Sequence, residues 1–161
     1  MQNLIPAAER IAALLRARRE TLAVAESSTG GLISAALLAV PGASAYFVGG
    51  GVIYTRMARF ALLGLSDDAM EGMRSSSEPY ALLLARTAQM RLETTWGLAE
   101  TGAAGPSGNR YGDAPGHSCL AVAGPDEASE TIETGRGDRA GNMRLFAAGA
   151  LALLERHLAR T

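Results

Sequence analysis

The sequence of 161 residues contains no lysine, and all 15 of its basic residues are arginine. This absence excludes a phosphate-binding loop of the Gly-Lys-Ser/Thr type, a lysine Schiff base and a lysine general base. Arginine cannot take over proton transfer, because the pKa of its guanidinium stays above about 12. Other side chains must therefore carry out any acid–base chemistry of this chain.

The chain also has a single cysteine, a net charge close to zero and no long apolar run. Cys119 is the only cysteine, which excludes an internal disulfide framework and suits a reducing compartment. The formal net charge is −1, which is not the balance of a protein that binds nucleic acid or acidic membranes. No apolar run is long enough to span a membrane, and the first residues lack the basic region and cleavage site of a signal peptide. We therefore expect a cytoplasmic protein without nucleic-acid or membrane partners.

The chain does contain an alternation of strand-like and helix-like segments. Its 48% of apolar residues and 19 glycines are typical of a globular protein with many tight turns. Periodicity and turn residues predict helices over 6–19, 30–39, 56–64, 78–93 and 139–158, and strands over 21–26, 45–55, 96–101, 117–124 and 129–135. No linker interrupts this pattern, so we expect one domain over residues 1–161, of the α/β class with a mixed sheet.

The stretch 21–40 carries the strongest functional signal. An apolar strand ends in Glu26, and the turn Ser-Ser-Thr-Gly-Gly leads into a helix. Hydroxyls and backbone N–H groups at a helix N-terminus stabilise negative charge, so this turn suits an anionic ligand or an oxyanion. A purely structural interpretation fits equally well, because serine and threonine cap helices and glycines make turns.

A second loop rich in glycine and proline follows the strand predicted over 96–101. The carboxyl ends of parallel strands meet at one edge of a sheet, where ligands bind in open α/β folds. If the two strands are parallel, both loops therefore border one crevice.

Six motifs recur in a characteristic order over residues 5–158: AESSTGG (25–31), PGAS (41–44), GGGVIYT (49–55), SEP (77–79), TGAAGPSG (101–108) and GDR (137–139). Together they resemble the C-terminal domain of the competence/damage-inducible protein CinA, which also occurs alone as nicotinamide-nucleotide amidase. The resemblance implies a three-layer α/β/α sandwich. It also implies hydrolysis of nicotinamide mononucleotide to nicotinate mononucleotide and ammonia, without a metal or organic cofactor, by a homo-oligomer.

The resemblance also implies which residues form the site. Ser27 falls on the family's catalytic serine, Tyr54 on its tyrosine, and Arg59 on its lysine. Ser28 stands where the family usually has cysteine, and Arg56 where it usually has asparagine. Expected substrate-binding residues come from the two glycine-containing turns: Glu26, Ser28, Thr29, Gly30, Gly31, Thr101, Gly102, Gly105, Pro106 and Gly108.

The arginine at position 59 leaves the chemistry open between two hypotheses. In the first, Ser27 attacks the amide, and backbone N–H groups around Thr29, Gly30 and Gly31 stabilise the oxyanion. Tyr54 would relay a proton, and Arg59 would hold charge near the site. The base would be His117, whose ordinary pKa suits the role, or Tyr54 with its pKa lowered by Arg59. His117 also fits a structural role as a strand-edge histidine that bonds to water or backbone. In the second, the chain is a catalytically silent or rewired paralogue that binds a nucleotide or a partner protein.

Arginines fit the second hypothesis, because a guanidinium binds phosphate in bidentate fashion. Arg59, with Arg56 and Arg110, could bind a nucleotide phosphate, or all three could be solvated surface charges. The simplest interpretation of Cys119 is a packed core residue, and Arg139 of the GDR motif is more often a surface ion-pair partner than a ligand contact.

Overall fold

A mixed five-stranded sheet forms the centre of the computed structural model, which describes residues 1–160. The strands follow the order β2-β1-β3-β4-β5: β2 (Phe47–Val52), β1 (Leu22–Glu26), β3 (Trp96–Ala103), β4 (His117–Ala123) and β5 (Ala128–Glu133). β1 pairs in parallel with both β2 and β3, whereas β4 and β5 continue the sheet antiparallel. The carboxyl ends of β1 and β3 therefore lie side by side, as expected for a shared crevice.

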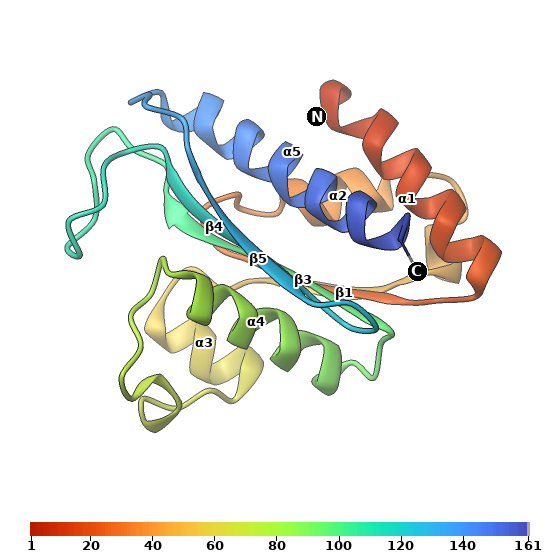
Figure 1. Ribbon diagram of the computed structural model, residues 1–161, viewed down its shortest axis with the longest axis horizontal. Coiled ribbons are helices and arrows are strands. Elements are labelled where there is room, and N and C mark those ends of the chain that lie inside the picture. Colours follow the sequence, from red (N-terminus) through yellow and green to blue (C-terminus); the bar gives the residue numbers. More distant parts are fainter. Residues whose placement is uncertain (161) are drawn as a thin grey trace.

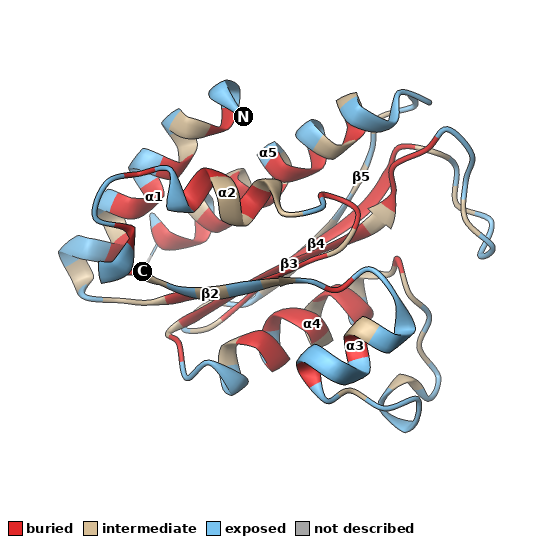
Figure 2. Cartoon of the chain, turned by 180° about the vertical axis from the view of Figure 1, so that it is seen from behind, coloured by how far each residue is buried: buried red, intermediate tan, exposed pale blue. Residues whose placement is uncertain are grey.

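Helices cover both faces of this sheet, so the molecule has the expected three α/β/α layers (Figure 1). One face carries α1 (Ile5–Arg18), α2 (Leu32–Leu38) and α5 (Arg139–Leu158), and the other carries α3 (Arg56–Leu63) and α4 (Glu78–Arg91). The buried residues concentrate in the strands and on the sheet-facing sides of the helices (Figure 2). No helix in residues 1–160 is long and apolar enough to cross a membrane.

The two hydrophobic cores on either side of the sheet differ in the size of their side chains. The core under α1, α2 and α5 contains large residues such as Trp96, Tyr46 and Leu151. Trp96 is fully buried at the start of β3, and its indole N–H donates to Glu20 Oε2 at 2.7 Å. The core under α4 consists mainly of alanines, so this helix lies close to the sheet.

The sequence predicted every one of these helices and strands, and most bounds differ by one to three residues. The helix expected over 30–39 begins only at Leu32, because Gly30 and Gly31 have φ angles of 65° and 101° that end the turn in the left-handed region. The strand expected over 45–55 is shorter because residues 43–45 form a 3₁₀ turn. The pairing of β2 with β1 shifts in register between Phe47 and Gly49, where the glycines of this strand begin.

Candidate active site

Two buried glutamates stand next to each other where β1 and β3 end. Ala25 pairs with Ala99, so the following residues, Glu26 and Glu100, occupy neighbouring positions on the parallel strands. Both side chains are completely buried, with 0% exposure. Buried carboxylates need hydrogen-bond donors to offset their lost hydration. The Ser-Ser-Thr-Gly-Gly turn supplies most of these donors.

Glu26 holds the N-terminus of α2. Its carboxylate accepts hydrogen bonds from the backbone N–H groups of Gly31, Ile33 and Ser34, at 3.0, 3.1 and 2.9 Å. The hydroxyls of Thr29 and Ser34 add two contacts, each of 2.7 Å. The negative charge expected at this helix N-terminus is therefore the protein's own carboxylate.

Glu100 holds the first half of the same turn. It accepts from the backbone N–H groups of Ser27 and Thr29, both at 3.0 Å, and from the hydroxyls of Ser28 and Ser118. The Thr29 hydroxyl lies between the two glutamates, 2.7 Å from Glu26 Oε2 and 3.0 Å from Glu100 Oε2. Burial raises the pKa of Glu100 above its ordinary value, although the hydrogen bonds from Ser28, Thr29 and Ser27 act in the opposite direction. The backbone at Ser27 is therefore fixed by a carboxyl group from a distant strand.

The expectation that the backbone N–H groups of Thr29, Gly30 and Gly31 stabilise an oxyanion is wrong, because all three have partners within the protein. The N–H of Thr29 donates to Glu100, that of Gly31 to Glu26, and that of Gly30 to the carbonyl of Ser27 at 3.1 Å. None of the three is left for a ligand. Between residues 27 and 34, Ser28 alone has a backbone N–H without a hydrogen-bond partner in the described chain.

A cavity of about 470 Å³ lies beside this turn and contains all three expected catalytic residues, Ser27, Tyr54 and Arg59. Two of the expected substrate-binding residues, Thr101 and Gly102, also line it, and the remaining walls come from the start of α3, the segment before α4 and the loop after β3: Ile53, Thr55, Arg56, Ser75, Ser76, Tyr80, Asn109, Arg110 and Tyr111. Residues far apart in the sequence thus meet around Ser27.

A smaller cavity of about 190 Å³ adjoins it and shares Tyr54, Gly102 and Asn109 with the first. Ser28, Gly105 and Gly108 line this second cavity. The other expected substrate-binding residues line neither cavity: Glu26, Thr29, Gly30, Gly31 and Pro106. Glu26 and Thr29 are buried inside the turn, so they position it and are not placed to contact a ligand.

Arg139 connects three parts of the site. From the first turn of α5 it donates to the carbonyl of Gly105 at 2.6 Å and to the hydroxyl oxygen of Tyr54 at 3.1 Å. Our interpretation of Arg139 as a surface ion-pair partner is therefore wrong, because its partners are a loop carbonyl and the expected catalytic tyrosine.

Arg59 is buried, with only 6% exposure, although it carries a permanent charge. Its Nη2 lies 2.8 Å from Oδ1 of Asp67, and its Nε is a buried polar atom without a hydrogen-bond partner. Burial raises the pKa of the neighbouring Tyr80, while the charge of Arg59 and a hydrogen bond from it act to lower that pKa. Arg59 is therefore not one of the solvated surface charges.

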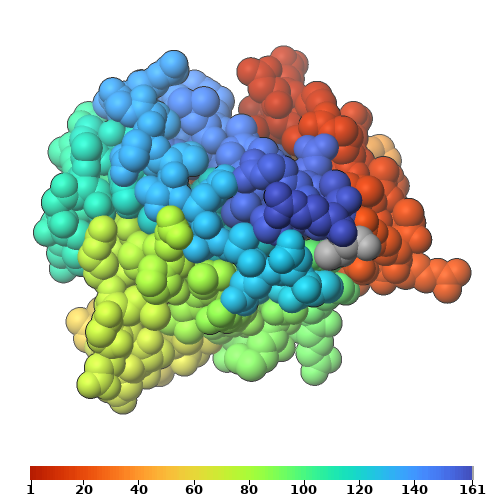
Figure 3. Space-filling model, viewed as in Figure 1, coloured from red at the N-terminus to blue at the C-terminus, as the bar shows by residue number. Residues whose placement is uncertain are grey.

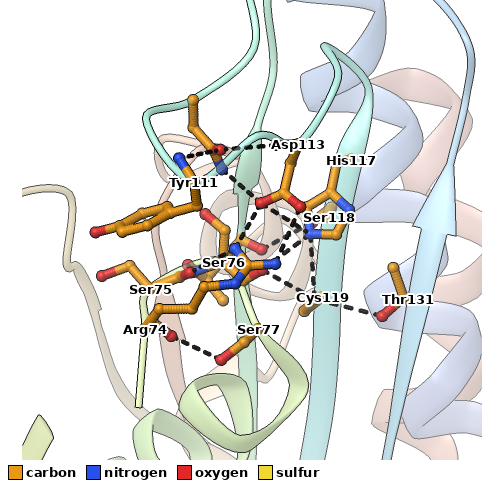
Figure 4. A network of polar contacts seen from close by, with 12 residues as sticks. Arg74, Ser75, Ser76, Ser77, Tyr111, Asp113, His117, Ser118, Cys119 and Thr131 are labelled. Atoms are coloured by element: carbon orange, nitrogen blue, oxygen red, sulfur yellow. Dashed lines mark hydrogen bonds and ion pairs between the residues drawn. The ribbon is translucent and has the colours of Figure 1, made fainter. Parts of the chain in front are cut away.

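His117 is not placed to act as a base for Ser27. Its Nδ1 lies 2.5 Å from Glu133 Oε1. Its Nε2 lies 2.9 Å from the carbonyl oxygen of Ser76 (Figure 4). Burial lowers the pKa of His117, but these two contacts and the nearby Asp113 raise the pKa by more than burial lowers it. The net shift of the pKa is therefore upward. Two acceptors on one ring are satisfied together only by the imidazolium, which has no free nitrogen.

The same network joins two walls of the cavity. Arg74 forms a bidentate pair with Asp113, at 2.6 and 3.0 Å, and its guanidinium lies 5.4 Å from the ring centre of Tyr111. The loop after β3 therefore contacts the segment before α4, as the adjoining surfaces show in Figure 3. Cys119 is buried in this network, where burial raises the pKa of its thiol, so it is a packed residue as expected.

Sequence reasoning missed Glu100, although a signal for it exists. β3 contains the sequence Leu-Ala-Glu-Thr-Gly at residues 98–102, and the end of β1 with the turn after it reads Val-Ala-Glu-Ser-Ser at residues 24–28. The same apolar run followed by glutamate and a hydroxyl residue thus occurs on both central strands. Asp67 carries no such signal, because it lies in an irregular segment and its importance depends on the spatial position of Arg59.

Fold and site together define a three-layer α/β/α protein with a serine-bearing turn, anchored by two buried carboxylates, beside a ligand-sized cavity. The family described as "CinA C-terminal domain" matches residues 5–158, and the chain therefore belongs to this family.

Relatives and solved structures agree with this membership. CinA-like proteins of Parasynechococcus marenigrum and a Nostoc species are 40% identical to the chain over 151 and 156 residues, which are 92% and 90% of it. The chain spans only about a third of their length, 36% and 37%.

A crystal structure of a competence-damaged protein (CinA) superfamily protein from Escherichia coli matches with a TM-score of 0.88 at 27% identity, covering 95% of this chain and 90% of that one. The competence/damage inducible protein CihA from Agrobacterium tumefaciens matches with a TM-score of 0.88 at 28% identity, covering 97% and 95%. The expected homo-oligomer and cytoplasmic location stay predictions.

Proposed function

We propose that this chain hydrolyses the carboxamide of nicotinamide mononucleotide, giving nicotinate mononucleotide and ammonia, with Ser27 as nucleophile. Membership of the CinA C-terminal domain family supports an activity of this kind. The observation that carries the proposal is the position of Ser27, whose backbone is fixed by Glu100 at the wall of a cavity that also contains Tyr54. A nucleophile on a fixed turn needs little reorganisation before it attacks.

The neighbouring groups support the other steps. The N–H of Ser28 is the donor that the turn leaves for an oxyanion. Because Arg139 donates to the hydroxyl oxygen of Tyr54, the phenolic proton is free to point at another acceptor. In our proposal Tyr54 relays a proton: its oxygen takes the proton of the attacking Ser27 hydroxyl, and its own proton goes to the amide nitrogen. The nitrogen then leaves as ammonia while the tetrahedral intermediate collapses to the Ser27 ester. Water then hydrolyses this ester, returns a proton to Ser27 and releases nicotinate mononucleotide.

A second candidate is a silent paralogue that binds a nucleotide without hydrolysing it. Specific observations favour it: the chain has no lysine, Arg59 is engaged by Asp67, and both ring nitrogens of His117 have partners. General acid–base assistance is worth about 10²–10⁴ in rate, so the loss of a base would be conspicuous.

Ammonia release from nicotinamide mononucleotide separates the two candidates. We expect activity in the unmodified protein and its loss by several orders of magnitude in Ser27→Ala. Ser75→Ala, which removes another hydroxyl from the same cavity, is the matched control and should retain activity. An inactive but folded protein that gains activity with Arg59→Lys would instead establish the silent paralogue.

A further inference from the structure

The carboxylate of Asp67 bridges two arginines of α3. Its Oδ1 lies 2.8 Å from Nη2 of Arg59, and its Oδ2 contacts Nη2 of Arg56. The three side chains differ greatly in exposure: 7% for Arg59, 54% for Asp67 and 78% for Arg56. Among residues 1–160, this buried guanidinium thus has as its only acidic partner a half-exposed carboxylate on an irregular segment.

This arrangement leaves Arg59 incompletely satisfied. Its Nε is the one buried side-chain nitrogen or oxygen in residues 1–160 without a hydrogen-bond partner. Leaving such a donor unpaired is unfavourable, and more so when the group is charged. Arg59 lines the cavity of Ser27, so its guanidinium group borders the space that an anionic ligand would enter.

The cavity itself carries positive charge. Arg56, Arg59 and Arg110 line it, and its lining residues include no aspartate or glutamate. Thr55 and Arg56 also place the N-terminus of α3, the positive end of its dipole, at the wall. Asp67 lies outside this lining, in an adjoining hollow with Arg56, Met57 and Phe60.

We infer that Arg56 and Arg59 form a binding site for a phosphomonoester, and that Asp67 occupies these arginines as an internal substitute anion until the ligand arrives. A phosphate offers more charge and more acceptor oxygens than a carboxylate, and arginine binds both groups with the same fork of donors. The inference deepens the proposed function by placing the phosphate of its substrate. The binding site does not require a working Ser27.

Removal of the competing carboxylate provides the central test. Calorimetric titration with inorganic phosphate, and with nicotinamide mononucleotide in a Ser27→Ala background that does not hydrolyse it, should show about threefold to tenfold tighter binding when Asp67→Asn is introduced. Asp68→Asn removes the same charge one residue away, at an exposed side chain outside the ion pairs around Arg59, and should change the affinity less than about twofold. Equal tightening by both substitutions would attribute the effect to net charge and overturn the inference.

Replacement of the two arginines tests the inference in the opposite direction, because it should weaken phosphate binding. Arg56→Gln, an exposed substitution that leaves the core intact, should weaken the binding of both probes roughly tenfold, and Arg59→Gln should weaken it more. Nicotinamide riboside, which lacks the phosphate, should bind equally to the unmodified protein and to Asp67→Asn. Absence of phosphate-dependent binding in Asp67→Asn would overturn the inference.

Ser27→Ala keeps this test separate from the amidase test. The variant should bind inorganic phosphate as tightly as the unmodified protein, because Ser27 is not a phosphate ligand in our inference. If ammonia release fails while Asp67→Asn still tightens phosphate binding, the proposed function falls and the anion site stands. If ammonia release is normal but neither aspartate variant alters phosphate binding, the anion site falls alone.

Discussion

Glu26 and Asp67 each occupy a place that an anionic ligand could take. Glu26 accepts the N–H groups at the start of α2, and Asp67 accepts from the arginines of α3. Their exposures, 0% and 54%, separate permanent from replaceable partners. A fully buried carboxylate cannot leave without unfolding the turn, whereas a half-exposed one can turn into water.

His117 gives the fold a dependence on pH at the residue scale. Burial lowers its pKa, but Glu133, the Ser76 carbonyl and Asp113 raise it more, so the folded pKa lies above the ordinary value of 6.5. A group whose pKa is raised by folding stabilises the fold fully below its unfolded pKa. This contribution is lost as the pH rises through the folded pKa.

We therefore expect the melting temperature of the unmodified protein to exceed that of His117→Gln most at about pH 6, and the difference to shrink toward about pH 9. Thermal unfolding of both proteins across this range, followed by circular dichroism, provides the measurement. A difference that stays constant with pH would mean that folding does not shift the pKa of His117.

The sequence identified the residues of the serine turn but not what holds them. The hydroxyls and glycines of residues 27–31 form a local pattern, and Ser27, Tyr54 and Arg59 do line one cavity. Glu100, Arg139 and Asp67 act through contacts with residues that are 8 to 85 positions away in the chain. Such pairings depend on how strands and helices assemble, which residue types alone do not specify.

At the scale of elements, close contact between α4 and β3 depends on Gly97. A Cβ atom at this position would lie 2.0 Å from the carbonyl oxygen of Ala85, which is helix backbone and cannot move aside. The alanines of the same core allow this approach. A methyl group at Gly97 would therefore push α4 away from the sheet.

We expect Gly97→Ala to lower the free energy of unfolding by about 2–3 kcal/mol. Gly137→Ala is the matched control, because a Cβ there would meet only the carbonyl oxygen of Pro106, at an ordinary 3.7 Å. Urea unfolding of both variants gives the comparison. Equal midpoints would show that α4 has room to shift.

Helices and strands were predictable because each carries its own periodicity and end signals. α5 (Arg139–Leu158) has the predicted bounds, and α3 ends before Gly64, which has the left-handed φ of 65° that favours glycine. The N-terminus of α2 was not predictable to the residue, because Gly30 and Gly31 are compatible with helix or turn and Glu26 decides between them.

At the scale of the whole molecule, the helices on the two faces of the sheet differ in how many residues they bury. In α3 only Arg59 and Leu63 are buried, whereas Met57, Phe60 and Leu62 are exposed. α5, in contrast, buries nine residues in its own layer. An eight-residue helix gains little stability by itself, so its stability depends on packing that α3 largely lacks.

Native-state hydrogen exchange should reveal this difference. We expect the amides of α3 to exchange roughly tenfold faster or more than those of α5, because local opening needs less free energy where few apolar contacts break. Mass spectrometry of peptic fragments provides the measurement. Equal protection would contradict the prediction and would indicate that another surface covers the exposed side chains of α3, as in the expected homo-oligomer.

The single tryptophan offers a consequence for spectroscopy. Trp96 lies fully buried at the start of β3, five residues and therefore roughly 16 Å along the strand from Thr101 in the cavity wall. Fluorescence excited selectively at tryptophan thus reports the integrity of the core and is insensitive to what occupies the cavity. Tyr54, Tyr80 and Tyr111 line that cavity, so tyrosine absorbance reports the ligand, and the two chromophores follow folding and occupancy independently in one sample.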